Sequence, residues 1–288
     1  MANPSQTTGT GPARIAGGDS GLARRLQREL EGEVLFDAFS RGSYSTDASM
    51  YQSEPLGVVV PRHRQDVLCA LQIAAEAGVP VLPRGGGTSQ IGQTVGAALV
   101  MDNSKYLNRI GDFDAASQRV WVEPGLVLDH LNRWLKPQGL FYPVDVSTGN
   151  RATLGGMAGN NSCGARSLRY GNMVHNLQAI DALLADGTAA HFGALKDANG
   201  EQLPAQLLRS LTELGQREAE EIERRFPRLL RRVGGYNIDE LVDPKTGNLG
   251  RLLVGSEGTL AYFTELELQL QPLPAHKVLG VCHFPTFH

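Results

Sequence analysis

Residues 79–93 have the sequence VPVLPRGGGTSQIGQ, in which an apolar segment runs into Pro83 and three glycines follow. The apolar residues predict a β-strand, and the glycines predict a loop at its end. Successive backbone N–H groups without Cβ atoms can curl into a concave anion site, to which the Thr88 and Ser89 hydroxyls add donors. Arg84 either adds charge or faces solvent. The stretch therefore predicts a pyrophosphate cradle, with a glycine-rich surface turn as the alternative.

Two common phosphate-binding motifs are absent from this loop. A Walker loop needs a Gly-Lys pair followed by Ser or Thr, and the chain has no such pair. The Rossmann fingerprint needs a third glycine where this chain has Gln90. A nucleoside triphosphatase and an ordinary nicotinamide dehydrogenase are therefore both disfavoured.

Two further glycine clusters extend the candidate site. Residues 153–171 (TLGGMAGNNSCGARSLRYG) predict a long loop of small and amide side chains, which suits a ligand with phosphate and heteroaromatic edges. Asp145, just upstream, either binds ribityl or ribose hydroxyls or caps a turn or helix. In GSEGTLAYFT at 255–264, Glu257 lies between glycines at a strand's end, which alone would indicate a solvated turn. Three such loops in one chain favour a shared binding site.

The composition indicates a globular protein of one large domain or two small ones. Of the 288 residues 41% are hydrophobic, and the formal net charge of −3 gives no basic surface for nucleic acid. Cys69, Cys163 and Cys282 lie far apart, so neither a disulfide framework nor a metal site is expected. No segment approaches the ~20 apolar residues of a membrane helix. Residues 1–19 look like a loose tail rather than a secretory signal, and we expect a cytoplasmic protein or one peripheral to the inner face of the membrane.

Hydrophobic periodicity and turn signals predict an α+β fold. Helices are expected from Ser20, as the cap, to about Leu30, and at 64–78, 126–135 and 204–225. Strands are expected at 57–61, 79–82, 97–101, 119–123, 177–184, 188–192, 252–254 and 262–270.

The end of the chain carries one more strand signal. Residues 277–284 (KVLGVCHF) predict a strand, and the chain stops four residues later. Because a strand needs a partner, we expect this chain to be a fragment of a longer protein.

Together these motifs resemble the FAD-linked oxidase superfamily, with its vanillyl-alcohol-oxidase or PCMH type of FAD-binding domain. The branch that they resemble most contains glycolate oxidase FAD subunits, D-lactate dehydrogenases and D-2-hydroxyglutarate dehydrogenases. The resemblance rests on YSTDAS at 44–49, VVVP at 58–61, PRGGGTS at 83–89, EPG at 123–125, GGMAGNNSCGARSLRYG at 155–171, LADG at 184–187, GGYN at 234–237 and GSEGTLAYFTE at 255–265.

This resemblance implies a PCMH-type domain of two α+β subdomains with FAD between them. An N-terminal tail and helix would occupy residues 1–43, and the start of a truncated substrate or cap domain would occupy 273–288. The first subdomain would span 44–105 and carry the pyrophosphate loop, and the second would span 106–272.

The same resemblance assigns cofactor contacts residue by residue. The pyrophosphate would meet Arg84, Gly85, Gly86, Gly87, Thr88 and Ser89. The flavin and ribityl would meet Asp145, Gly155, Gly156, Asn161, Gly164, Tyr170 and Gly171. The nucleotide half would lie near Glu257 and Gly258.

Two departures from the family pattern affect these contacts. Cys163 replaces a glycine of the commoner Asn-Ala-Gly-Gly form, and a packed, inert thiol is favoured over a reactive one. The pyrophosphate loop has no histidine for a covalent link, so non-covalent FAD is expected. His175 is interpreted as a structural or surface imidazole.

The resemblance also implies an activity for the full protein. It would oxidise a 2-hydroxy acid such as D-lactate, glycolate or D-2-hydroxyglutarate to a 2-oxo acid by hydride transfer to flavin. The catalytic base and substrate-binding residues would lie beyond residue 288, and so would an iron–sulfur cluster if the protein has one. The electron acceptor is not identified by the sequence. The alternative is a non-catalytic flavin or nucleotide module that serves assembly or electron relay.

Replacing Gly86 with a bulky residue should abolish flavin retention, because a side chain would fill the space that the loop leaves for phosphate. Flavin absorbance of the purified variant measures the effect. Unchanged retention would refute the assignment of this loop.

Overall fold

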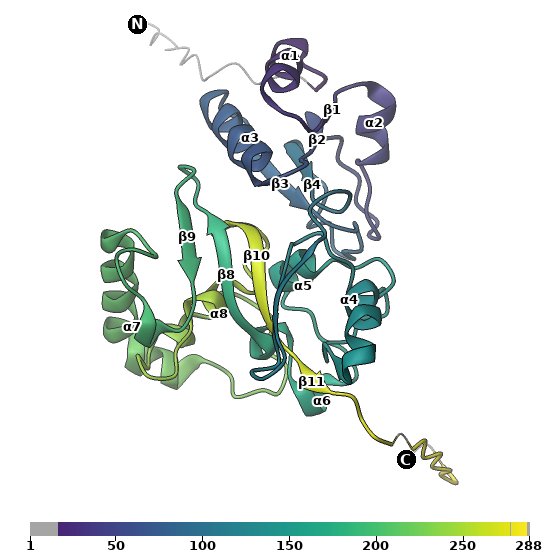
Figure 1. Cartoon of the computed structure of the whole chain (residues 1–288), viewed down its shortest axis with the longest axis vertical. Helices are drawn as coiled ribbons and strands as arrows, with labels where there is room; N and C mark the ends of the chain where they lie inside the picture. The colour runs from purple at the N-terminus through teal and green to yellow at the C-terminus, as the bar shows by residue number, and fades with distance from the viewer. Residues whose placement is uncertain (1–16, 277, 287–288) are drawn as a thin grey trace, which may run out of the picture.

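The computed structural model describes residues 17–276 and 278–286 and contains two β-sheets, one above the other in Figure 1. One sheet has four strands and the other has five. We call the part built on the four-stranded sheet the first unit and the part built on the five-stranded sheet the second unit. Helices pack against both sheets, which confirms the predicted α+β class.

The first unit has strands in the order β1-β2-β4-β3. β2, β4 and β3 are parallel, and β1 pairs antiparallel with β2. Its strands are β1 (Glu33–Leu35), β2 (Gly57–Val60), β3 (Val81–Arg84) and β4 (Leu99–Asp102). Its helices are α1 (Ser20–Glu29), α2 (Ala38–Ser43) and α3 (Arg64–Glu76). Leu26 of α1 and Val67 of α3 pack with Val59 and Leu99 in one apolar core, so α1 and β1 belong to this unit although they precede residue 44.

The second unit is an antiparallel sheet in the order β5-β6-β10-β8-β9. Its strands are β5 (Ile110–Asp114), β6 (Arg119–Val122), β8 (Leu177–Leu183), β9 (Ala189–Phe192) and β10 (Tyr262–Gln269), with a small extra pair, β7 (Leu140–Phe141) and β11 (Gln271–Pro272). Its α-helices are α4 (Leu128–Leu135), α5 (Leu154–Asn160), α6 (Ser167–Tyr170), α7 (Ala205–Arg225) and α8 (Leu249–Leu253). Its 3-10 turns are η1 (Lys136–Gln138), η2 (Met173–Asn176), η3 (Leu195–Asp197) and η4 (Ile238–Leu241).

Alternation along β10 explains how this sheet buries one face. Leu266 and Leu268 are fully buried in the core with Leu131 of α4, whereas Glu265 and Glu267 are only partly buried on the opposite face. A period of two in burial is what a half-covered antiparallel strand requires.

Two predicted elements need correction where a polar side chain caps a helix. Asp19, not Ser20, caps α1, because its carboxylate accepts the Leu22 N–H at 2.7 Å. The segment 252–254 is not a strand: α8 ends at Leu253, and its N-cap Asn248 accepts the Arg251 N–H at 3.0 Å. A short leucine run is compatible with either structure, and the cap decides it here.

The predicted strand at 277–284 is also wrong for the residues that the structure describes. No strand forms over 278–286, and Val278, Leu279 and Phe284 are exposed. Lys277 lies outside the described residues, as do residues 1–16 of the predicted tail. No described segment pairs with 278–286, and an apolar sequence without a hydrogen-bonding partner does not make a strand.

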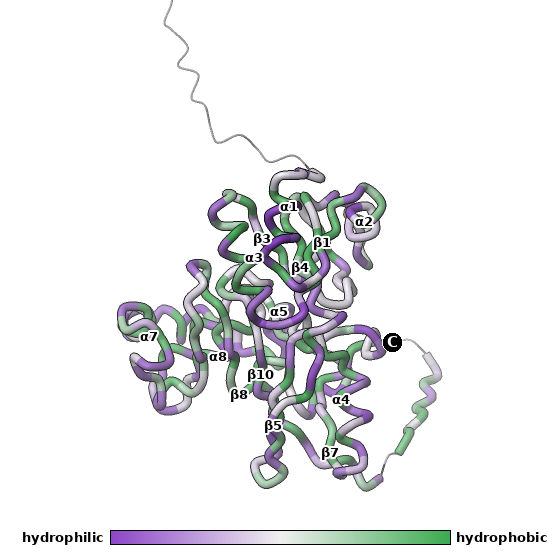
Figure 2. The backbone as a smooth tube through the Cα atoms, turned by 45° about the horizontal axis from the view of Figure 1, so that its top comes forward, coloured by the Kyte–Doolittle hydropathy of each residue, from purple (hydrophilic) through white to green (hydrophobic). Residues whose placement is uncertain are grey.

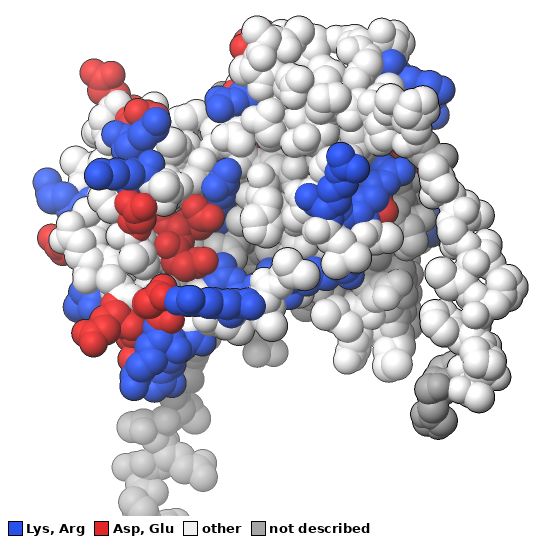
Figure 3. Space-filling model, turned by 90° about the horizontal axis from the view of Figure 1, so that it is seen from below, with Lys and Arg blue, Asp and Glu red and all other residues white. Residues whose placement is uncertain are grey.

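The surface mixes polar and apolar character along each helix. Hydrophobic and hydrophilic residues are interspersed in α4 and α7 (Figure 2), as expected for helices with one buried face. Acidic and basic side chains lie close together on the face in Figure 3, and α7 pairs Glu221 with Arg224. None of the helices in the described ranges is both long and apolar enough to cross a membrane.

The two units share a packed junction at the start of β10. Tyr262 and Leu183, both in strands of the second sheet, pack into the apolar core of the first unit. The Tyr262 hydroxyl also donates to the Asn103 side-chain oxygen, just after β4. Both partners of this hydrogen bond are buried, so it joins the units without access to water.

Tyr262→Phe should lower the free energy of unfolding by about 1–3 kcal/mol, because the Asn103 oxygen would be left buried without its donor. Tyr236→Phe is the matched control: Tyr236 is exposed and its hydroxyl bonds Thr259 at 2.8 Å, so a change within about 0.5 kcal/mol is expected. Urea denaturation measures both variants. Equal losses would contradict the role given to the buried junction.

Candidate functional site

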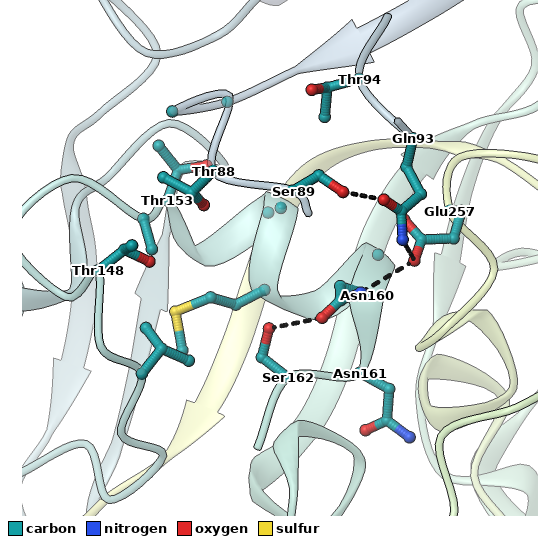
Figure 4. A pocket seen from close by; sticks show the side chains of 18 of the residues that line it. Thr88, Ser89, Gln93, Thr94, Thr148, Thr153, Asn160, Asn161, Ser162 and Glu257 are labelled. Carbon is teal, nitrogen blue, oxygen red and sulfur yellow. Dashed lines mark hydrogen bonds between the residues drawn. The ribbon is translucent and has the colours of Figure 1, made fainter. Parts of the chain in front are cut away.

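A large cleft lies between the glycine loop that follows β3 and the helix α5 (Figure 4). Its volume of about 980 Å³ is near the upper end of the roughly 300–1,000 Å³ range of cofactor and ligand sites. Most of the predicted site residues line it: Arg84, Gly85, Gly86, Gly87, Thr88, Ser89, Asp145, Gly155, Gly156, Asn161, Gly164, Glu257 and Gly258. Segments far apart in sequence therefore converge on one space.

The glycine loop offers a row of unused donors. Across the described part of the chain, the backbone N–H groups from Gly85 to Ser89 donate to no protein acceptor. Gly87 has φ +61°, in the left-handed region that glycine adopts readily. Backbone amides left unpaired beside a cleft are what an anionic ligand needs.

The same loop also packs tightly on its neighbour. A Cβ atom on Gly85 would lie 1.9 Å from the Thr153 hydroxyl oxygen, and one on Gly86 would lie 2.2 Å from the Arg151 carbonyl oxygen. These glycines are therefore required for loop docking as well as for ligand approach. A bulky residue at Gly86 would displace the loop itself, and loss of flavin would report both effects.

Arg84 holds the surroundings of the loop in place. Its guanidinium donates to the carbonyls of Thr46 at 2.8 Å, Thr94 at 3.0 Å and Tyr44 at 3.2 Å, and it lies 5.3 Å from the centre of the Tyr44 ring. The sequence left open whether Arg84 adds charge or faces solvent. In the structure it lines the cleft and donates three hydrogen bonds to backbone carbonyls.

The segment 153–171 is not one long loop, because it contains the helices α5 and α6. Gly155 lets α5 approach the preceding strand connection: its Cβ would lie 2.5 Å from Pro124, and its N–H bonds the Pro124 carbonyl at 2.8 Å. Tertiary packing thus forms a helix that its own glycine- and asparagine-rich sequence disfavours.

Thr153, at the N-cap of α5, carries an unsatisfied hydroxyl. Its side chain is 3% exposed, and its Oγ1 has no hydrogen-bond partner among the described residues. Thr153 lines the cleft, and its hydroxyl lies against Gly85 of the glycine loop. A buried hydroxyl without a partner is costly, and a ligand acceptor in the cleft would remove that cost.

Asn161 ends α5 with a left-handed backbone, φ +52°, a conformation that asparagine tolerates better than most residues. Both ends of its amide bind protein: Oδ1 accepts the Val174 N–H at 3.1 Å, and Nδ2 donates to the Arg232 carbonyl at 3.2 Å. Asn161 therefore shapes the cleft wall mainly by positioning these neighbours.

Asp145 caps the start of the turn that leads to α6. Its Oδ1 accepts the Arg166 N–H at 3.0 Å, which favours the capping role over hydroxyl binding. Gly164 packs against it, because a Cβ there would lie 1.9 Å from the Asp145 carbonyl oxygen. Cys163 is a partly buried free thiol that lines the cleft beside them.

Tyr170 and Gly171 do not line the cleft, because the chain turns away from it after α6. The Tyr170 ring packs edge-on against Phe141, with centroids 5.6 Å apart. Gly171 has φ +77°, and a Cβ there would lie 2.6 Å from the His175 ring. His175 accepts the Asn172 N–H at 2.9 Å, which is a structural use of this imidazole, and burial lowers its pKa.

Glu257 belongs to a network of polar side chains across the cleft (Figure 4). Its Oε1 accepts from Asn160 Nδ2 at 3.1 Å and from Gln93 Nε2 at 3.5 Å, and Gln93 in turn accepts from the Ser89 hydroxyl. Ser162 donates to Asn160 at 3.2 Å. Asn160 and Ser162 belong to the amide-rich segment 153–171 that the sequence indicated, although no cofactor contact was assigned to them, and Gln93 was not singled out from the sequence. Its only signal is its position close to residues that were.

Comparison with known proteins agrees with this geometry. Residues 55–193 match the family model of the FAD binding domain. These residues, just under half of the chain, are therefore similar to an FAD-binding domain. The predicted resemblance to FAD-linked oxidases is therefore confirmed.

The relatives of this FAD-binding domain are longer than the chain. It is 36% identical to D-2-hydroxyglutarate dehydrogenase from Pantoea ananatis, covering 88% of this chain and 27% of the relative. It is 31% identical to glycolate oxidase subunit GlcD from Bacillus subtilis, covering 86% and 44%. It is 30% identical to mitochondrial D-lactate dehydrogenase [cytochrome] from Arabidopsis thaliana, covering 92% and 39%. The chain thus spans between about a quarter and less than half of these relatives' length.

The fold also matches solved structures. An alkyldihydroxyacetonephosphate synthase superposes with a TM-score of 0.63 at 18% identity, over 89% of this chain and 44% of that chain. At this identity the match speaks for the shared fold alone.

The groups that line the cleft fit the chemistry of a dinucleotide. It offers a row of unpaired N–H groups, the unsatisfied Thr153 hydroxyl and glycine surfaces that a Cβ would obstruct. The only charged side chains among the described residues that line it are Arg84, Asp145 and Glu257. Many neutral donors with little formal charge fit a pyrophosphate joined to sugar and ring systems.

Thr153→Val should weaken FAD binding by about 3- to 10-fold while leaving the ligand-free protein as stable or more stable, because the lost hydroxyl has no protein partner. Thr264→Val is the matched control, since the hydroxyl of Thr264, on β10, donates to the carbonyl of Asp181, on β8, at 3.0 Å. The control should lose about 1 kcal/mol of unfolding free energy and keep its FAD affinity. Fluorescence titration and urea denaturation measure the two quantities, and the reverse pattern would contradict the proposed contact.

Proposed function

We propose that this chain is the FAD-holding part of an oxidoreductase that converts a 2-hydroxy acid, such as D-lactate, glycolate or D-2-hydroxyglutarate, to a 2-oxo acid. The observation that carries the proposal is the convergence of unpaired loop amides and an unsatisfied threonine hydroxyl on one cofactor-sized cleft. The named activities of the longer relatives supply the substrate class.

The roles of the cleft residues follow from their donors. The amides of Gly85–Ser89 and the Thr153 hydroxyl would bind the pyrophosphate. Gly155, Gly156 and Gly164 would let the ribityl and flavin approach the backbone closely. Asn161 and Asp145 would shape the wall, and Tyr170 and Gly171 would act only through the turn that they stabilise.

The chemistry would be divided between this chain and the rest of the protein. When bound, the flavin supplies the acceptor for the hydride that leaves the substrate's α-carbon. The chain's own residues hold and orient that cofactor. Asp145 is engaged by a backbone amide, so we assign the base that takes the hydroxyl proton, and the substrate-binding residues, to polypeptide outside this chain.

The proposal also covers how FAD is attached and where its electrons go. The described residues that line the cleft include no histidine, which supports non-covalent FAD. Electrons would pass to an acceptor held elsewhere, such as an iron–sulfur centre or a quinone, and the protein would act in the cytoplasm or at the inner face of the membrane.

The purified chain should become yellow with FAD and release all of it on denaturation, yet D-lactate or D-2-hydroxyglutarate should not bleach it. A longer polypeptide that continues past residue 288 should be bleached by its substrate. Flavin absorbance measures each step. Substrate oxidation by this chain alone at a normal enzymatic rate would refute the assigned division, and a colourless protein that binds another nucleotide instead would favour a non-catalytic module.

A further inference from the structure

Glu257 places an acidic side chain on the cleft wall that faces the glycine loop. The loop around it is fixed to both units: the Glu257 N–H donates to the Gly159 carbonyl at 3.0 Å, and Gly258 packs against Pro83. Through Gln93, the carboxyl is two hydrogen bonds from the Ser89 hydroxyl. A ligand held by the loop amides would therefore lie next to this carboxyl.

The backbone at Glu257 supports a ligand-directed role. Its φ is +51°, a left-handed conformation that is uncommon for residues other than glycine, asparagine and aspartate. The flanking residues Gly255 and Gly258 share this conformation, so a third glycine would relieve the strain. Strained backbone that keeps a particular side chain is typical of functional positions.

No positive charge balances Glu257 in the described structure. No charged group acts on its carboxyl there, and its partners Gln93 and Asn160 are neutral amides. Arg84, the cationic side chain in the cleft lining, donates its hydrogen bonds to three backbone carbonyls. Of the remaining ionisable groups, Asp145 lies at another part of the wall and is bound to Arg166.

A further ionisable neighbour, besides the free thiol of Cys163 in the cleft lining, comes from the segment after α7. Tyr236 bonds its hydroxyl to Thr259 at 2.8 Å, two residues beyond Glu257, and does not neutralise the carboxyl. Packing in the cleft wall raises the pKa of Glu257 by desolvation, and the hydrogen bonds from Asn160 and Gln93 oppose that shift only in part. Water in the open cleft still reaches the side chain, and a bound ligand would remove that water.

A pyrophosphate and a carboxylate are both hydrogen-bond acceptors and both negative, so they repel each other unless a proton lies between them. We propose that Glu257 binds the dinucleotide as an uncharged carboxylic acid that donates a hydrogen bond, so that FAD binding captures one proton at this side chain. The proton comes from solvent, and no bond other than O–H forms. This inference rests on the proposed FAD site and adds the protonation state of one of its residues.

Linkage fixes the direction of the pH effect. A ligand that prefers the acid form raises the pKa of Glu257 further in the complex. FAD affinity is then constant below the pKa of the free protein, falls by up to about tenfold per pH unit between the two pKa values, and is constant again above the pKa of the complex. Weaker FAD binding at higher pH is the expected sign.

Titration calorimetry with FAD tests the proposal on the full chain, from about pH 5 to about pH 8, in buffers with different ionisation enthalpies. The wild-type protein should take up a proton, up to one per FAD at the pH of greatest linkage. Glu257→Gln, whose amide donates without titrating, should show no uptake and an affinity independent of pH. Glu265→Gln is the matched control: burial also raises the pKa of Glu265, but it lies on β10 outside the cleft lining, so uptake should persist.

The outcomes separate this inference from the function on which it rests. FAD binding without proton uptake, together with at least tenfold weaker binding by Glu257→Gln, would mean that a carboxylate accepts ribose hydroxyls and would overturn the inference alone. Uptake that persists in Glu257→Gln would also overturn it. Failure of the wild-type chain to bind FAD at all would overturn the proposed function as well.

Discussion

The arrangement of the cleft depends on the close packing of two glycines, Gly85 and Gly86, against the second unit. The glycine loop after β3 lies directly on the segment around Arg151 and Thr153, at a separation that a single Cβ would close. This contact brings the parallel sheet of the first unit to the N-terminus of α5 in the second. Since the loop amides point to no protein acceptor, the contact also leaves them available at the line where the units meet.

Around that contact, most polar side chains form hydrogen bonds to other protein groups in the walls of the cleft. Arg84 binds carbonyls, Asn161 binds a carbonyl and an amide, and Asp145 caps a turn. Few groups remain for a ligand: the loop amides, the Thr153 hydroxyl and the network around Glu257. A site built mainly from backbone donors keeps its geometry with little dependence on side-chain rotamers.

The sequence indicated the glycine loop, the α+β class and most residues of the cleft, because glycine clusters after apolar strands have few structural uses. It did not indicate α5, whose glycines and asparagines argue against a helix until the contact with Pro124 is known. It did not separate Tyr170 from the cleft, since a family motif contains residues that shape a turn as well as residues that touch a ligand. Two of the three carbonyls that Arg84 binds belong to Tyr44 and Thr46, 40 and 38 residues away, so its role could not be predicted locally.

The buried tyrosine at the start of β10 has a consequence for cofactor exchange. With Tyr262 and Leu183 packed into the core of the first unit, the walls of the cleft cannot part by a simple hinge without exposing apolar core. The receptor is therefore preorganised, and a cofactor that enters loses its own torsional freedom rather than ordering the protein. Neither association nor dissociation of the cofactor then requires the domains to open. Differences in FAD affinity between variants should therefore lie mainly in the dissociation rate.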